Sequence, residues 1–123
     1  MAADWTDLVD HVHDVIGDVI TVHVGRGRRH DVWVLECEDG CELAGYVGDA
    51  SLLIDSGLSI VDLWIRNRTM RLAQYAVDAV GDVWVSSWAP SAGITSQDFE
   101  VLLRHVAAEA DRLEYLLTGQ DAH

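Results

Sequence analysis

Two cysteines, Cys37 and Cys41, and two histidines, His23 and His30, are the residues of this sequence best suited to metal chemistry. Zinc prefers thiolate and imidazole ligands, and structural zinc sites usually show two close ligand pairs. This sequence has one such pair, and Gly40 between the two cysteines is explained by a hairpin turn. We therefore expect no metal and no other cofactor. Both cysteines are expected to be small buried residues, with a cross-strand disulfide as the remaining alternative.

Residues for nucleophilic or acid–base catalysis show no specific pattern. No Gly-x-Ser-x-Gly elbow is present, and Ser86 and Ser87 fall within a strand pattern. His11 and His13 are two residues apart in an expected helix, so their side chains diverge and should lie on the surface. Twenty-one acidic residues make carboxylate pairs uninformative. We expect no catalytic residues and a protein that is not an enzyme.

Basic residues form one cluster, Gly-Arg-Gly-Arg-Arg at residues 25–29. An anion could bind there, but the cluster lacks the pattern and the following helix of a phosphate-binding loop. We interpret it as a solvated hairpin loop. Arg66, Arg68 and Arg71 follow an expected helix, where cations suit the negative end of the helix dipole.

Length and composition predict one domain over residues 1–123, because 123 residues with 50% hydrophobic content and five Trp suffice for a single core. The net charge of −13 disfavours nucleic acid and anionic membranes as partners. The apolar runs are too short for a membrane helix, and the first residues lack a secretory pattern. The expected location is the cytoplasm.

The acidic residues comprise fifteen Asp and six Glu, and the chain contains no Lys. Two explanations are open. Adaptation to concentrated cytoplasmic salt is favoured, because the carboxylates are spread along the chain and salt screens their repulsion. GC-rich codon usage combined with a cationic partner is the alternative.

The elements that must position these residues begin with an expected amphipathic helix over residues 4–16, which Gly17 ends. A strand follows over residues 19–24. Strands over residues 31–37 and 41–47 form a hairpin. A three-residue loop would place Cys37 opposite Cys41 and gather the apolar side chains, Trp33 among them, on one face. A two-residue loop would put Glu42 on the Trp33 face, so we predict the three-residue loop.

The second half of the chain contains a helix that ends near Asn67, with Ser59 and Asp62 as a capping pair. Strands over residues 70–77 and 83–88 flank a turn at residues 78–82. Thr95 and Asp98 cap a long terminal helix that Gly119 closes. The predicted fold is therefore α+β with a single antiparallel sheet, in the order α-β-β-β-α-β-β-α.

The Trp residues carry more information than the polar groups. Trp5 and Trp33 fall on predicted core faces. Trp84 and Trp88 share one face of the last strand, whereas Val83 and Val85 occupy the other. An exposed indole pair would mark a partner site, although another helix or a symmetry mate could cover it.

The order of elements resembles the type III secretion chaperone-like superfamily, including its YbjN-like branch. The resemblance is carried by Trp-Ile-Arg-Asn at residues 64–67, Tyr-Ala-Val-Asp at residues 75–78, Gly-Asp-Val at residues 81–83, the Pro/Gly loop at residues 89–95 and the final helix that begins Thr-Ser-Gln-Asp-Phe. It implies a secretion-chaperone-like, acidic, non-enzymatic homodimer that binds an extended segment of a protein or peptide client.

The resemblance also implies which residues make contacts. The partner-binding residues would be Tyr75, Trp84 and Trp88. The dimer interface would lie on the middle helix, at Leu58, Val61, Trp64 and Ile65. The alternatives are a structural or assembly subunit without a client, and then a zinc-binding protein or an enzyme.

Overall fold

The computed structural model describes residues 5–25, 27–57, 59–68 and 72–118. In this part of the chain the elements, in order, are η1 (Trp5–Leu8), β1 (Asp14–Ile16), β2 (Val19–Gly25), β3 (Arg28–Cys37), β4 (Gly40–Gly48), α1 (Ala50–Asp55), α2 (Ile60–Asn67), β5 (Gln74–Val77), β6 (Val83–Pro90) and α3 (Ser96–Thr118).

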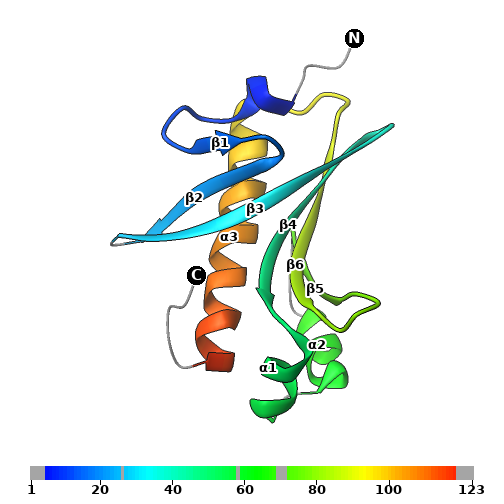
Figure 1. The fold of residues 1–123 in the computed structure, drawn as a ribbon. Helices are drawn as coiled ribbons and strands as arrows, with labels where there is room; N and C mark the ends of the chain where they lie inside the picture. Colours follow the sequence, from blue (N-terminus) through cyan, green and yellow to red (C-terminus); the bar gives the residue numbers. More distant parts are fainter. Residues whose placement is uncertain (1–4, 26, 58, 69–71, 119–123) are drawn as a thin grey trace.

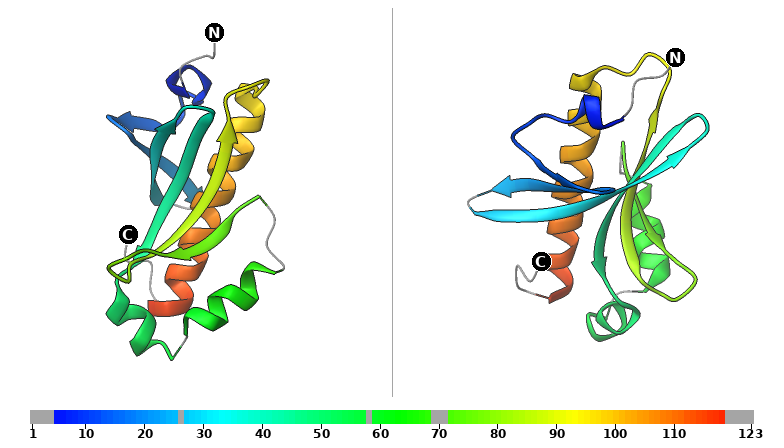
Figure 2. Two further views of the ribbon diagram at one scale, coloured as in Figure 1. Left: turned by 90° about the vertical axis from the view of Figure 1, so that its right-hand side faces the viewer. Right: turned by 45° about the horizontal axis from the view of Figure 1, so that its top comes forward.

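The strands form one twisted antiparallel sheet in the order β1-β2-β3-β4-β6-β5. The long helix α3 runs across one face of this sheet and contacts β2, β3, β4 and β6 (Figures 1 and 2). We call this the helix face and the opposite one the outer face. The predicted α+β fold with a single antiparallel sheet is confirmed.

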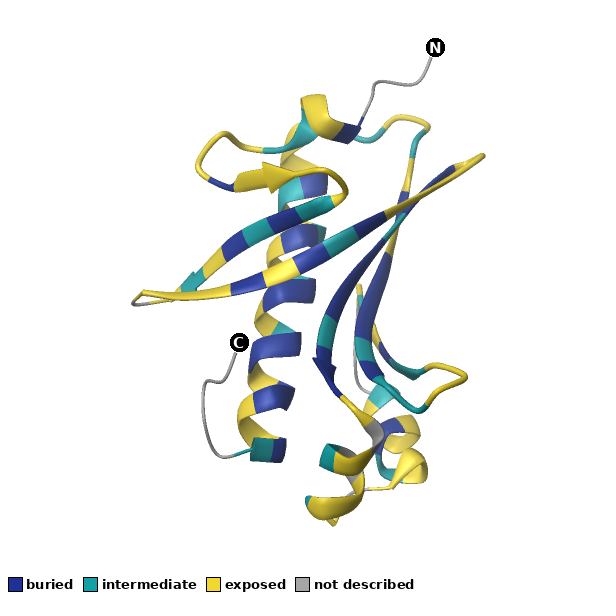
Figure 3. Cartoon of the chain, viewed as in Figure 1, coloured by how far each residue is buried: buried dark blue, intermediate teal, exposed yellow. Residues whose placement is uncertain are grey.

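The core lies between α3 and the helix face. Strand residues alternate between the two faces, so every second residue points toward α3, and Figure 3 shows this alternation along β3. The strands bury apolar side chains there, and α3 contributes the matching stripe at spacings of three and four. The fully buried residues include Ile20, Val22, Val32, Leu43, Val47, Val83, Val85, Phe99, Leu103, Val106, Ala110 and Leu113.

The helix predicted over residues 4–16 is wrong beyond its first turn. Only Trp5–Leu8 is helical, as a 3-10 turn, and Asp14–Ile16 is strand β1. Gly17 has a φ of +60° and starts the two-residue turn that pairs Ile16 with Val19. The β-branched residues on both sides of Gly17 and Asp18 are therefore a hairpin signal, which the helical spacing of the apolar residues concealed.

The predicted register of the β3–β4 hairpin is also wrong. Cys37 pairs with Gly40 across a two-residue turn, and Leu35 pairs with Glu42. Val32 and Val34 therefore point to the helix face, and Trp33 points to the outer face. Both faces of this hairpin are apolar enough to be buried, so the apolar pattern could not fix the register. Glu42 is accommodated because the outer face stays partly exposed.

Both predicted capping pairs are confirmed. Ser59 and Asp62 form a reciprocal capping box on α2, and Thr95 and Asp98 exchange the same bonds before α3. The short helix α1, capped by Asp49, was not predicted. The strand predicted over residues 70–77 is shorter in the structure: β5 begins at Gln74, Leu72 and Ala73 lie outside it, and residues 70 and 71 are not among those described. The proposed closure at Gly119 also lies outside the described residues.

The free edge of β5 is occupied by a side chain from α2. The Asn67 amide nitrogen donates to the carbonyl oxygen of Tyr75 at 2.9 Å, and its oxygen accepts from the Tyr75 backbone N–H at 2.6 Å. A primary amide offers the same donor and acceptor pair as a peptide unit. Asn67 therefore takes the place of a further strand at this edge.

Replacing Gly45 with Ala is expected to destabilise the fold by about 1–3 kcal/mol, because overpacking a close helix–sheet contact forces backbone shifts. A Cβ at Gly45 would lie 2.9 Å from the Ala110 Cβ and 3.4 Å from Val106 Cγ1. The free energy of unfolding should be measured by urea denaturation. Gly25→Ala is the control, because its nearest neighbour would lie at 3.6 Å; an equal loss in both variants would refute the packing explanation.

Candidate functional site

The outer face carries four aromatic side chains from three neighbouring strands. Trp33 comes from β3, Tyr46 from β4, and Trp84 and Trp88 from β6. We call this group the aromatic face. Trp33 is a correction to the expected core position, because the observed register turns it away from α3. Trp84 and Trp88 do share a face, as predicted, and Val83 and Val85 are buried on the other.

Trp84 lies at the centre of this group. Its ring contacts Trp33 edge to face, with a centroid distance of 5.8 Å, and Tyr46 edge to face at 5.1 Å. Small side chains at Ala44 and Ser86, which pair across β4 and β6, leave room for the indoles. Such aromatic pairs are favourable beyond their buried area, so the rings are held in fixed relative positions.

The indole of Trp84 is also fixed by the turn that precedes β6. Its Nε1–H donates to Asp78 Oδ2 at 3.0 Å, while Asp78 Oδ1 accepts from the backbone N–H groups of Val80 and Asp82. The hydrogen bond from Trp84 is the main reason that the pKa of Asp78 lies below its usual value. The sequence Asp78–Asp82 therefore builds both the turn and the support for this ring.

The aromatic face remains accessible. Trp88 is 46% exposed, and Leu35, which lies two positions from Trp33 on the same face, is 52% exposed. In the described part of the chain, α3 packs on the helix face and α2 contacts the sheet at edge strand β5, so no helix crosses the aromatic face (Figure 2).

Carboxylates surround the aromatic face. Glu42 stands between Leu35 and Trp88 in the cross-strand register. Burial raises the pKa of Tyr46 above its ordinary value, and the negative charges of Asp82, Asp49 and Asp78 raise that pKa further. The electrostatic potential at this end of the face is therefore negative.

Tyr75 does not lie on the aromatic face. It pairs with Val85 on the helix face, is buried, and directs its hydroxyl to Glu109 of α3 at 3.3 Å. Burial and the Glu109 carboxylate both raise the pKa of Tyr75. Tyr75 is expected to bind a partner together with Trp84 and Trp88, but it lies on the opposite face of the sheet. Its neighbours Gln74 and Ala76 point to the outer face, so Tyr75 between them points to the helix face.

The expected dimer residues Val61, Trp64 and Ile65 lie together on one side of α2. Each is more than half exposed, and Trp64 reaches 65%. Leu63 points inward and is buried. The fourth expected residue, Leu58, lies outside the described residues. Helix α2 therefore presents an apolar side that nothing in the described part of the chain covers.

The cysteines and histidines of the suggested zinc site do not converge. Cys37 is exposed on the outer face, which corrects its expected burial, whereas Cys41 is buried on the helix face. Burial, chiefly, raises the pKa of Cys41 to about 11. His30 is buried and bonds the Tyr46 carbonyl oxygen, and His23 is exposed. The described residues contain no group of three potential metal ligands, and both cysteines are free thiols.

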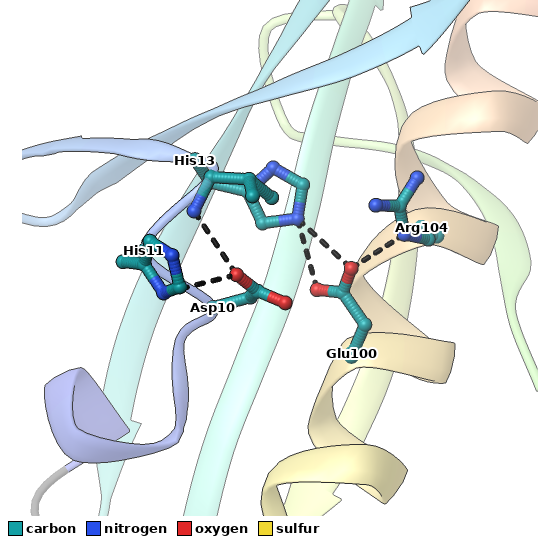
Figure 4. Close-up of polar contacts among 6 residues, drawn as sticks. Asp10, His11, His13, Glu100 and Arg104 are labelled. Atoms are coloured by element: carbon teal, nitrogen blue, oxygen red, sulfur yellow. Dashed lines mark hydrogen bonds and ion pairs between the residues drawn. The ribbon is translucent and has the colours of Figure 1, made fainter.

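His13 is a buried polar contact that the sequence analysis placed on the surface. Its Nε2 lies 2.9 Å and 3.0 Å from the two carboxylate oxygens of Glu100, which also accepts a hydrogen bond from Arg104 (Figure 4). The loop reaches this position through a turn at Asp10, whose backbone oxygen accepts from the His13 N–H. The contact ties the N-terminal segment to the first turns of α3.

A pocket of about 490 Å³ lies at the end of the sheet where η1, the β3–β4 hairpin and the loop before α3 meet. Its apolar walls come from Trp5, Leu8, Ile94 and Phe99. The backbones of Gly40 and Ala89 lie close together here, because a Cβ added at Gly40 would lie 2.3 Å from the Ala89 carbonyl oxygen. None of the four aromatic side chains lines this pocket, although Gly40 at its rim lies beside the Trp88 ring.

Replacing His13 with Ala is expected to lower the free energy of unfolding by about 2 kcal/mol, because it leaves the Glu100 carboxylate without its buried partner. The His13 side chain is fully buried, whereas that of His11 is 98% exposed. His11→Ala should therefore change stability by no more than about 0.5 kcal/mol. Chemical denaturation of both variants measures the difference, and similar values would contradict the assigned role of His13.

Comparison with known proteins gives a fold and no family. No protein-family model matches the sequence, and no curated protein matches it. Among solved structures, the chain is similar to one from the heterodimeric complex ExoU–SpcU of the type III secretion system of Pseudomonas aeruginosa. The TM-score is 0.56 at 13% identity, with 85% of this chain and 87% of that chain covered. The likeness supports the expected secretion-chaperone-like fold, and the YbjN-like branch stays a prediction.

Proposed function

We propose that this chain is a non-enzymatic module that binds an extended segment of another protein on its aromatic face. The carrying observation is the ordered arrangement of Trp33, Tyr46, Trp84 and Trp88 on the sheet face away from α3, where Trp88 is exposed and the other three rings are partly buried. Aromatic side chains of this kind dominate the energetics of protein interfaces. The likeness to a chain from a type III secretion complex supports the same class of function.

The binding mode follows from the shape of the face. Same-face side chains along a strand lie about 6.8 Å apart, which is also the spacing of alternate side chains in an extended segment, so such a segment can place alternate side chains against successive cross-strand rows. The row of Leu35, Glu42 and Trp88 and the row of Tyr46 and Trp84 offer separate contacts. The ring positions are already fixed, so binding costs little ordering entropy.

The second part of the proposal is a homodimer that forms through the exposed side of helix α2. The exposed side of Val61, Trp64 and Ile65 is contiguous along the helix, which contacts the sheet at edge strand β5. Burying it against a second copy would remove apolar area from water while leaving Trp84 and Trp88 available. The alternative is a structural subunit without a client, which would also use the apolar side of α2 but not the aromatic face.

The setting proposed for this module is the cytoplasm, and its acidic surface has two explanations, adaptation to concentrated salt and a cationic partner. No described helix combines the length and the apolar character needed to cross a bilayer. The proposed module uses no cofactor and does not bind nucleic acid, because its net charge of −13 repels phosphate.

The Trp84→Ser, Trp88→Ser double variant is expected to lose at least tenfold in affinity for client peptides, because two interface indoles each contribute more than about 1 kcal/mol. Binding should be measured by fluorescence polarisation against a panel of labelled extended peptides. The circular dichroism spectrum and the solution mass should stay unchanged. Unfolding of the variant would assign both residues to the core, and unchanged binding would overturn the proposed site.

The solution mass tests the dimer. Light scattering is expected to give twice 13.6 kDa, about 27 kDa, for the parent chain. Trp64→Ser should shift the mass toward 13.6 kDa, because it removes the largest side chain from the apolar side of α2. A mass of 13.6 kDa for the parent at every salt concentration would refute the dimer and leave the aromatic face to be tested alone.

A further inference from the structure

Three of the six described arginines pair with carboxylates of α3. Arg28 pairs with Asp111 at 3.1 Å, and Arg104 and Arg112 pair with Glu100 and Glu109. All three carboxylates belong to α3, which lies on the helix face. These arginines are therefore committed to one side of the sheet.

Two carboxylates of the aromatic face are not paired with arginine in this way. Glu42 and Asp82 form no ion pair with any described residue. Glu42 lies in register between Leu35 and Trp88, and Asp82 lies near Tyr46, whose pKa its charge raises. Arg29 shares the outer face and lines a hollow with Asp31, Trp33 and Tyr46. Arg66 lies on α2 and Arg68 at its C-cap, and α2 contacts edge strand β5. The unpaired carboxylates used in this argument are therefore Glu42 on β4 and Asp82 before β6.

Indole rings next to uncompensated carboxylates favour one kind of ligand. A Lys or Arg side chain lying on a Trp face gains a cation–π interaction, and its apolar stem covers the ring. A neighbouring carboxylate adds a charge-assisted hydrogen bond. An acidic or phosphate-bearing ligand would meet repulsion from the same carboxylates. The chemistry of this surface therefore distinguishes among clients by charge.

We propose that the client segment bound by the aromatic face is basic, with Arg or Lys side chains that contact Trp84 and Trp88. The same cations pair with Asp82 and Glu42. In an extended segment the cations occupy every second position, because alternate side chains point to the same face. This inference rests on the proposed function and specifies the chemistry of its client.

The test uses three labelled nine-residue peptides and the full chain. In the first, Arg alternates with Val; in the other two, Gln or Glu replaces every Arg. The Arg peptide should bind at least tenfold more tightly than the Gln peptide at about 50 mM NaCl, and most of this advantage should disappear at about 500 mM NaCl because salt screens exposed charges. The Glu peptide should bind most weakly.

Single substitutions test whether the preference for the Arg peptide arises at Glu42 and Asp82. Glu42→Gln and Asp82→Asn should each weaken binding of the Arg peptide about threefold and leave the Gln peptide unchanged. Asp7→Asn is the matched control, because Asp7 is an exposed carboxylate on η1, which packs beside α3. An equal effect of Asp7→Asn would reduce the preference to net charge and overturn the assignment to this face.

The outcomes separate this inference from the proposed function. Equal binding of the Arg and Gln peptides, lost in the Trp84→Ser, Trp88→Ser variant, would overturn the basic client and leave the peptide-binding function intact. Binding of none of the three peptides or of the wider panel would overturn both. Preference for the Arg peptide with loss in all face variants would support both.

Discussion

The packing of α3 against one face of the sheet determines which strand residues form the core and which remain on the surface. Gly45 permits the close approach of Ala110 and Val106, and alternate strand residues on this side form the core. A single long helix covers one face of a strongly twisted sheet, so every second residue of the same strands remains outside. The aromatic face therefore arises from the same strands and the same alternation that build the core.

The two sides of the sheet differ in how their charges are compensated. On the helix face, Glu100, Glu109 and Asp111 of α3 lie opposite histidine or arginine side chains. On the outer face, rigidity comes instead from ring contacts and from the bond between Trp84 and Asp78. The helix face thus contributes the core, while the outer face leaves charge and apolar area partly exposed.

Local signals in the sequence predicted much of this arrangement. The capping pairs of Ser59 and Thr95 could be predicted because each joins residues only three positions apart. The alternation of valine and tryptophan along β6 is likewise visible in the sequence of that strand alone. The failures lie where two patterns compete. Residues 4–16 fit a helical period and also a hairpin at Gly17, and both faces of β3 and β4 are apolar, so only α3 decides which face is inside. The hydrogen-bonded contact of His13 with Glu100 joins residues 87 positions apart, which no local pattern reports.

The amide of Asn67 has a consequence for how copies of this protein can associate. An exposed strand edge is a template for continuous growth into fibrils, because each added strand presents a new edge. Asn67 occupies the backbone groups of Tyr75 that an incoming strand would use, and a side chain does not regenerate an edge. Strand addition is therefore blocked at Tyr75, and this part of the edge does not act as a template for growth.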